Sequence, residues 1–359
     1  MSALRIVVIG ESWHGSSCTG LARGFRAGGH AVELIGLDTF FPTVDRSLAA
    51  RALRRALSPF CRAQYNRHML AAVHRLQPDL VVVYKGTAVA PATLADFRRR
   101  GVWLCHVMPD VGVEDHWSLD PRIFRYFDHV FTMKSFGPAY FRERHGVRDV
   151  SFLPHGFDPL VHRPRAPHPS RPVSFIGSRT PRKEAYLRRL ADAVGWENLD
   201  VWGEGWGGVR AGALRRSVHG AGVYGDFYAA AVSGSRINLG LLYEGPPGHP
   251  SGDLTTERTF HIPACGGFLL HERTAELADY YEEGRECACF GSPDELVEKV
   301  SWYLRHDDER VRIARAGHLR CVRENALSVR AEAIVRRFLA ERPAGAGARV
   351  EDAPGSRHA

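Results

Sequence analysis

Residues Thr255–Leu270, TTERTFHIPACGGFLL, are the most informative segment of this sequence. The stretch reads as a short helix that turns through Gly266-Gly267 into a buried strand, Phe268-Leu269-Leu270. Threonines at the start of a helix leave backbone N–H groups and the positive end of the helix dipole directed outward, and together these bind a phosphate group well. The stretch therefore predicts a phosphate site directly before a buried strand.

Short apolar runs alternate with helical stretches along the rest of the chain. Continuous apolar runs of this length predict parallel strands that are buried on both faces, and hence doubly wound sheets. One set of runs comprises 4–10, 31–35, 79–84, 102–107, 129–133 and 150–153, and a second set comprises 173–176, 199–202, 236–242, 267–270 and 287–290. We expect an α/β fold of two Rossmann-like doubly wound domains whose strand ends, and so whose ligand sites, face each other across a cleft.

A proline-rich segment separates the two sets of runs. Pro164, Pro167, Pro169 and Pro172 cannot support a central strand or an uninterrupted helix. The expected organisation is an amino-terminal domain (1–160), a linker (161–172), a carboxyl-terminal domain (173–341) and a disordered tail (342–359). Three helices are expected after Phe290, the first opening at Pro293 and the others at 307–325 and 328–341.

The bulk composition is that of a globular protein without a membrane span. The 359 residues are 44% hydrophobic and 25% charged, and no apolar run approaches the roughly 20 residues that cross a bilayer. Seven cysteines, an odd number without CxxC pairs, suggest neither a disulfide framework nor a zinc site, so we expect a cytoplasmic protein. The net charge is +8, but the arginines are scattered, and a nucleic-acid partner is not indicated.

Polar and glycine residues follow three of the expected strands in the first half. The Gly10–Ser17 turn, with Gly10 and Gly15, either lets a diphosphate sugar or an acceptor approach the next helix or is a plain βα turn. His106 and Asp110 are candidates to contact a sugar or orient an acceptor hydroxyl, with second-layer packing as the alternative. Asp115-His116 and Lys85-Gly86 occupy similar positions. No constellation with metal-ligand spacing occurs in the sequence, so metal dependence is not expected.

The opening stretch resembles the nucleotide-sugar-binding segment of GT-B glycosyltransferases of group 1, in particular the spore-maturation CgeB-like branch. The resemblance covers about residues 4 to 335. A second motif, Leu153–Pro159, is similar to the signature that ends the amino-terminal domain of these transferases, with His155 where asparagine is usual. The resemblance implies that the amino-terminal domain holds the acceptor and that the carboxyl-terminal domain holds the donor.

The resemblance also implies roles for residues of the carboxyl-terminal domain. The strand–glycine turn 175–183 carries Ser178, Arg179 and Lys183, where the family places cations that neutralise the departing diphosphate. A cation at a helix start is otherwise electrostatically unfavourable, which favours a functional role for Lys183. Trp202, Gly203 and Tyr224 stand where related enzymes seat the nucleobase, although core packing explains most tryptophans.

The chain departs from the family pattern at its paired glutamates. Leu254 and His261 occupy the two positions, and His261 is left as a possible partner of the donor's ribose. The remaining candidates for donor contacts in this stretch are Asp253, Thr255, Thr256, Glu257 and Arg258.

We therefore expect a metal-independent glycosyltransferase that moves a sugar from a nucleotide-diphosphate donor to an acceptor hydroxyl or amine, with retention by family analogy and without a cofactor. The acceptor is expected to be a small molecule or a glycan. Two alternatives remain open, a nucleotide-sugar epimerase on the same fold and a noncatalytic nucleotide-sugar-binding protein.

Overall fold

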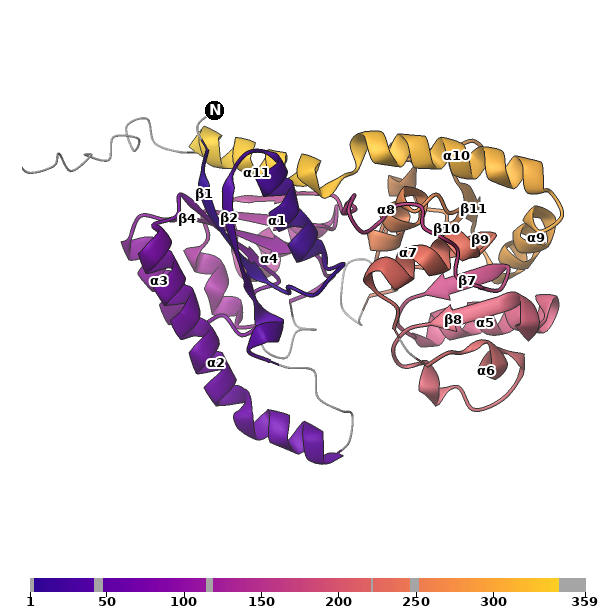
Figure 1. Ribbon diagram of the computed structural model, residues 1–359, viewed down its shortest axis with the longest axis horizontal. Coiled ribbons are helices and arrows are strands. Elements are labelled where there is room, and N and C mark those ends of the chain that lie inside the picture. Colours follow the sequence, from indigo (N-terminus) through magenta and orange to yellow (C-terminus); the bar gives the residue numbers. More distant parts are fainter. Residues whose placement is uncertain (1–2, 42–47, 114–118, 221, 246–251, 342–359) are drawn as a thin grey trace, which may run out of the picture.

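The computed structural model describes residues 3–41, 48–113, 119–220, 222–245 and 252–341. Its strands form two separate parallel sheets, one from each half of the chain (Figure 1). The first sheet has the order β2-β1-β3-β4-β5-β6. Its strands are Arg5–Gly10 (β1), Ala31–Gly36 (β2), Leu80–Tyr84 (β3), Trp103–Met108 (β4), His129–Thr132 (β5) and Val150–Phe152 (β6).

The second sheet has the order β11-β10-β9-β7-β8. Its strands are Val173–Ile176 (β7), Leu199–Trp202 (β8), Ile237–Gly240 (β9), Leu269–Glu272 (β10) and Ala288–Phe290 (β11). Every strand falls on an apolar run expected from the sequence, and the two doubly wound α/β domains are confirmed. Buried side chains cover both faces of each sheet, which is why the runs are continuous rather than alternating.

The helices pack on both faces of their sheets. Those of the first half are Ser17–Ala27 (α1), Leu48–Leu76 (α2), Pro91–Arg99 (α3) and Gly137–His145 (α4). Those of the second half are Pro181–Val194 (α5), Ala213–Ser217 (α6), Gly225–Gly234 (α7), Glu257–Ala264 (α8), Pro293–Tyr303 (α9) and Asp307–Glu324 (α10). The short 3₁₀ turns are Leu37–Thr39, Pro121–Tyr126, Trp196–Asn198, Trp206–Gly208 and Glu276–Asp279.

The last helix, Leu327–Glu341 (α11), returns to the amino-terminal domain (Figure 1). Its buried residues Ala331, Ile334, Val335 and Phe338 belong to the core beneath β1 and β3. A Cβ at Gly20 or Gly24 of α1 would lie 2.5 Å from a Leu327 side-chain carbon or 2.9 Å from Ser328 Cα, so these glycines let the two helices touch. The expected carboxyl-terminal domain, 173–341, therefore needs correction, since its last helix completes the other domain.

The switch points of the two sheets position the site. In the first sheet β1 lies between β2 and β3, and in the second β7 lies between β8 and β9. Neighbouring crossover helices leave opposite faces at such a point and open a crevice at the carboxyl ends of the strands. The expected tail 342–359, Asp115-His116 and the loop residues 246–251 lie outside the described residues.

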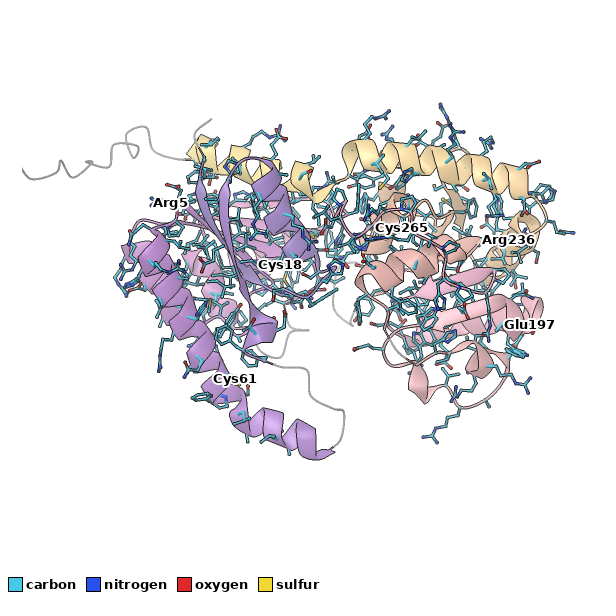
Figure 2. The ribbon with its side chains drawn as sticks, in the orientation of Figure 1. Arg5, Cys18, Cys61, Glu197, Arg236 and Cys265 are labelled. Atoms are coloured by element: carbon cyan, nitrogen blue, oxygen red, sulfur yellow. The ribbon has the colours of Figure 1, made fainter. Side chains whose placement is uncertain are left out.

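All seven cysteines are free thiols, and Cys18 and Cys265 are buried in different domains while Cys61 lies on α2 (Figure 2). In the described part of the chain, none of the helices combines the length and the apolarity that crossing a bilayer requires.

Candidate active site

A cavity of about 600 Å³ lies between the two domains, and we call it the interdomain cavity. Both switch points open into it, because its lining includes residues that follow β1 and β3 as well as residues that follow β7 and β9. The lining residues are Glu11, Trp13, Ser17, Tyr84, Lys85, Pro109, Asp110, Val111, Lys134, His155, Ser178, Lys183, Tyr243, Asp253, Thr256, Glu257 and Arg258.

Helix α8 points its amino terminus at this cavity. Thr256, the residue before the helix, lines the cavity, and its backbone N–H donates to Thr259 Oγ1 at 3.0 Å in a capping arrangement. The first N–H groups of a helix have no intrahelical acceptor and carry the positive end of the helix dipole. The phosphate site predicted from the sequence is thus a lining element of the cavity.

Arg258 extends from the first turn of α8 toward the end of the second sheet. Its guanidinium donates to the backbone carbonyls of Leu241 (2.8 Å) and Ile176 (3.4 Å), the residues at the ends of β9 and β7. Gly177 makes this path possible, because a Cβ there would lie 2.8 Å from Arg258 Nη1. The Arg258 Nε has no hydrogen-bond partner among the described residues. The positive charge is therefore held by dipoles and is not neutralised by an ion pair.

Lys183 is the second cation on this wall. Its side chain comes from the first turn of α5 and is only 4% exposed, and its Nζ lies 3.5 Å from the Ser178 carbonyl. Burial, together with the nearby charge of Arg258, lowers the pKa of Lys183 to about 8. Within the described ranges no salt bridge reaches Lys183 or Arg258, although the more distant carboxylates of Asp253, Glu244 and Glu272 partly oppose the lowering of the Lys183 pKa. Two cations without an ion-pair partner in those ranges therefore face the cavity; we call them uncompensated in this sense.

The opposite wall is different, because its cation is paired. Lys85 Nζ lies 3.1 Å from Glu11 Oε1 and 3.9 Å from Asp110 Oδ2. Burial opposes the charge of Lys85, but Asp110 and Glu11 outweigh it and raise the pKa of the ammonium group. Lys85 also adopts a φ of 60°, and Ala88 a φ of 62°, in the loop after β3. Such strained backbone is costly and concentrates at functional sites.

One ion pair joins the two walls. Lys134 Nζ, which follows β5, lies 2.5 Å from Asp253 Oδ1 of the other domain and 3.3 Å from His155 Nε2. Burial, reinforced by the charge of Lys134, lowers the pKa of His155 well below its ordinary value. A second link runs from the Ser17 hydroxyl to Glu257 at the start of α8. The donor candidates Asp253 and Glu257 thus lie at the seam between the domains.

Seven residues predicted from the sequence line the cavity together: Asp110, Ser178, Lys183, Asp253, Thr256, Glu257 and Arg258. Arg179 is not among the lining residues. Its Nε donates to Glu184 Oε2 at 2.5 Å, which holds the guanidinium against the first turn of α5. The cation that accompanies Lys183 in the structure is Arg258 and not Arg179, because Arg258 reaches across the end of the sheet.

His106 is not a lining residue either. It is 0% exposed, its ring packs against Phe124 and Phe127, and its Nε2 lies 3.0 Å from the Lys85 carbonyl oxygen. This placement fits the packing alternative, in which the imidazole contacts the backbone of the strained Lys85 segment.

His261 and Thr255 also face away from the interdomain cavity. The His261 ring stacks on His162 at 3.6 Å, and its Nε2 lies 3.2 Å from the Gly156 carbonyl. Burial lowers the pKa of His261 to about 3, so the ring is neutral at pH 7. Thr255 Oγ1 donates to Glu276 Oε1 at 2.6 Å. The contacts of these two residues are structural ones, and neither residue is among those that line the interdomain cavity.

The candidate base-contact residues of the second domain are used in packing. Trp202 stacks on His219 at 3.7 Å, and a Cβ on Gly203 would lie 2.1 Å from the Gly177 carbonyl oxygen. In the first domain, a Cβ at Gly10 would lie 2.7 Å from Cys18 Sγ. Tight backbone packing, and not ligand approach, therefore requires both glycines.

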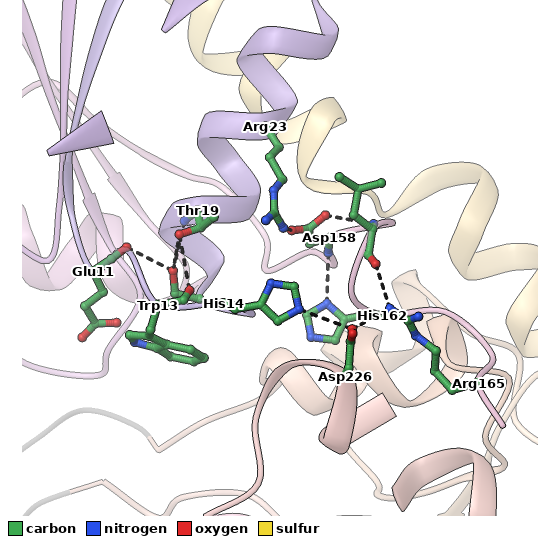
Figure 3. Close-up of polar contacts among 11 residues, drawn as sticks. Glu11, Trp13, His14, Thr19, Arg23, Asp158, His162, Arg165 and Asp226 are labelled. Atoms are coloured by element: carbon green, nitrogen blue, oxygen red, sulfur yellow. Dashed lines mark hydrogen bonds and ion pairs between the residues drawn. The ribbon is translucent and has the colours of Figure 1, made fainter. Parts of the chain in front are cut away.

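Gly15 and Tyr224 lie at the seam beside the cavity, next to the contact between His14 and Asp226 that Figure 3 shows. A Cβ on Gly15 would lie 2.8 Å from the Gly225 nitrogen, and Tyr224 packs edge-on against Trp13 at 5.1 Å. Asp226 accepts from Arg165 at 2.5 Å and lies 3.3 Å from His14 Nε2. The two motifs thus form an interdomain contact.

Several lining residues were missed by the sequence analysis: Glu11, Trp13, Ser17, Tyr84, Lys134 and Tyr243. Glu11 directly follows a predicted strand, so its position at the strand end was a readable signal. Lys134 follows the fifth strand in the same way, but its partner Asp253 lies 119 residues further on, and no pattern announces such a pair. The described residues contain no group of three or more His, Cys, Asp or Glu side chains placed to hold a metal ion.

Residues 179–336 match the family described as glycosyl transferase-like, so the second half of the chain carries a domain of this kind. In sequence, no curated protein matches the chain.

Solved structures resemble the whole chain. Sucrose-phosphate synthase from Thermosynechococcus elongatus has a TM-score of 0.60 and 15% identity, covering 94% of this chain and 99% of that one. HepE from Anabaena in complex with UDP has a TM-score of 0.56 and 13% identity, covering 94% and 100%. An α-glucosyltransferase in complex with UDP and a DNA containing an HMU base has a TM-score of 0.65 and 12% identity, covering 94% and 100%. At these identities the likeness establishes the fold, which is GT-B.

Proposed function

We propose that the chain is a glycosyltransferase that transfers a sugar from a nucleotide-diphosphate donor to an acceptor hydroxyl or amine. The observation that carries the proposal is the pair of uncompensated cations, Lys183 and Arg258, beside the amino terminus of α8 in the interdomain cavity. A diphosphate suits such a site, since it supplies the ion-pair partner that these two cations lack among the described residues.

The same cations supply the chemistry that the transfer needs. When the bond between the anomeric carbon and the diphosphate oxygen breaks, negative charge develops on the leaving group, and fixed cations in a closed site stabilise it without reorganisation. The acceptor oxygen forms the new bond to the anomeric carbon, and its proton passes to the departing diphosphate. We propose that this attack occurs on the same face, with retention, and that Lys183 and Arg258 serve in place of a metal or other cofactor.

The amino-terminal wall suits the sugar and the acceptor. Glu11, Asp110 and Lys85 present both hydrogen-bond acceptors and donors, with the lysine paired to the carboxylates, and such groups can bind neutral hydroxyl groups. Asp110 is proposed to orient the acceptor. We also propose that the chain belongs to the CgeB-like branch of group 1, on the basis of the sequence motifs. A cytoplasmic location is a further part of the proposal, and the seven free thiols support it.

Binding is tested first by thermal shift against UDP-, GDP-, dTDP- and ADP-sugars. The sugar that raises the unfolding temperature is then incubated with and without glycan and small-molecule acceptors, and both the released nucleoside diphosphate and the product anomer are measured. Acceptor-dependent release that persists in EDTA supports the proposal. Isomerised donor without acceptor would identify an epimerase, and tight binding without any turnover would identify a binding protein.

A further inference from the structure

The first half of helix α2 takes no part in the core of its domain. The buried core residues that α2 supplies, Tyr65, Met69, Ala72 and Val73, all lie in its second half. Among the described side chains between residues 52 and 63, none is buried. Figure 1 shows this half of the helix extending past the end of the sheet, away from the strands of its domain.

Three large apolar side chains form a stripe along this projecting half. Leu53 is 57% exposed, Leu57 is 47% exposed and Phe60 is 63% exposed. Their spacing of four and three residues places them on one face of a helix. On an ideal helix this face is opposite to positions 65, 69, 72 and 73, so the apolar stripe faces away from the protein's own core.

Such a stripe is not explained by the stability of the helix itself. Isolated helices of this length are marginal in water, and Pro59 removes a backbone hydrogen bond from the interior of this one. Contiguous exposed apolar side chains on such an element mark an interaction site. The projecting half therefore needs a surface that covers the apolar stripe.

Charge indicates which surface this is. The span 48–76 contains arginines at positions 51, 54, 55, 62, 67 and 75 and no aspartate or glutamate. A helix with an apolar stripe and a purely basic remainder is the pattern of a helix that lies in the headgroup layer of an anionic bilayer. A nucleic acid would pair with the arginines but leave the stripe in water, and a second copy of the chain would bring like charges together.

We propose that residues 52–64 of α2 bind an anionic phospholipid surface, with Leu53, Leu57 and Phe60 inserted between acyl chains and with Arg55 and Arg62 supplying positive charge for the lipid phosphates. The helix lies along the surface and does not cross it. This proposal is independent of the reaction catalysed in the interdomain cavity, because none of these residues lines that cavity.

The test is co-sedimentation of the full chain with vesicles of phosphatidylglycerol and phosphatidylcholine, or of phosphatidylcholine alone. We expect binding to the anionic vesicles at least about tenfold tighter than to the neutral ones, and weaker binding at high salt. The Leu53→Ser/Leu57→Ser/Phe60→Ser variant should lose about tenfold or more in affinity for the anionic vesicles. Leu319→Ser on α10 is the matched control, because Leu319 is 57% exposed, as Leu53 is, and it should bind as the wild type does.

Thermal unfolding of each variant is the control for folding. We expect unchanged unfolding midpoints, because the apolar stripe is not part of the core. Absence of vesicle binding by the wild type would overturn the proposal, as would equal binding by the triple variant. Binding of a DNA duplex that is insensitive to the triple variant, with no vesicle binding, would assign the basic helix to nucleic acid. Concentration-dependent dimerisation that only the triple variant loses would assign the stripe to self-association.

Discussion

The two walls of the interdomain cavity differ in how their cations are held. On the amino-terminal wall Lys85 sits between two carboxylates, 3.1 Å from Glu11 and 3.9 Å from Asp110. On the carboxyl-terminal wall the hydrogen bonds of the Lys183 and Arg258 side chains go to backbone carbonyl oxygens, and each cation also lies over an aromatic ring, at 5.8 Å from Tyr243 and 5.5 Å from Phe175. The lysine of the first wall is thus paired with carboxylates, whereas these two cations have no ion-pair partner among the described residues.

This difference indicates a division of labour within one cavity. An uncompensated buried ammonium group costs stability unless a ligand supplies the missing charge, and the lowered pKa of Lys183 reflects that cost. A lysine paired with carboxylates, as Lys85 is, carries less of this penalty, and its wall offers hydrogen bonds to uncharged groups. The charged half of a nucleotide sugar therefore belongs on the second wall, and the reacting hydroxyl groups belong on the first.

The largest effect is expected from removing one of the uncompensated cations. Lys183→Met should lower kcat/KM about a hundredfold, because leaving-group charge loses a fixed partner. The same variant should unfold at a higher temperature than the wild type at pH 7. Its unfolding free energy should rise by up to roughly 3 kcal/mol, since burial of a charged lysine is relieved.

The control for this variant is Lys85→Met on the opposite wall. Lys85 has a raised pKa and two carboxylate partners, so its replacement should lower stability and leave the affinity for a nucleoside diphosphate within about twofold. Calorimetric unfolding and initial-rate kinetics measure both properties. If the two lysine variants behaved alike, the distinction between the walls would be lost.

A smaller effect is expected at Asp110. Asp110→Asn should lower kcat by about tenfold and change the donor KM little, because the residue is assigned to orientation of the acceptor and not to the diphosphate. Steady-state kinetics with the donor varied, at saturating acceptor, separates the two parameters. A rise in donor KM with kcat unchanged would move Asp110 to the donor side.

A smaller effect is expected when the pH is varied and the affinity for the nucleoside diphosphate is measured. Lys183 has a pKa of about 8 in the ligand-free protein, against 10.5 ordinarily, so it loses its charge as the pH rises through 8. Affinity for the nucleoside diphosphate should fall several-fold between pH 7 and pH 9 on this account, while the ligand's own phosphate, with a pKa of about 6, stays ionised. Titration calorimetry should find this slope in the wild type and none in Lys183→Met.

The smallest effect is expected at Arg179. Because its guanidinium is bound to Glu184 beside the cavity and not in it, Arg179→Ala should change kcat/KM by no more than about twofold. A hundredfold loss would show that Arg179 swings into the cavity when donor binds, and would restore the cation pair expected from the sequence.

Local sequence patterns predicted the fold more completely than they predicted the site. The strands were predictable because each is a continuous apolar run, and the start of α8 was predictable because capping threonines precede a glycine-ended helix. The return of α11 to the first domain was not, since its apolar stripe fits either core equally well. Its contact with Gly20 and Gly24, some three hundred residues earlier, and its burial in the core beneath β1 and β3 assign it to the first domain.

Some of the site residues were also predictable from local patterns, whereas the roles of others depend on contacts between distant parts of the chain. Lys183 was a candidate because a cation in the first turn of a helix is unfavourable without a ligand, and Arg258 was a candidate because it stands in the donor-binding segment that the family resemblance indicates. His106 was a candidate because it lies near a strand end and His261 because it occupies a motif position, but aromatic packing accounts for the first and the seam between the domains for the second. Pairings such as Lys134 with Asp253 depend on how the domains meet, which no local pattern encodes.

Whether the carboxyl-terminal wall binds a diphosphate can be tested by comparing the affinity for a nucleoside diphosphate with the affinity for the corresponding nucleoside. The diphosphate selected by the thermal-shift screen and the matching nucleoside are titrated into the wild type and into Lys183→Met and Lys85→Met by calorimetry. We predict that the wild type and Lys85→Met strongly prefer the diphosphate and that Lys183→Met loses most of this preference. If Lys183→Met preferred the diphosphate as strongly as the wild type does, Lys183 would not be part of the diphosphate site.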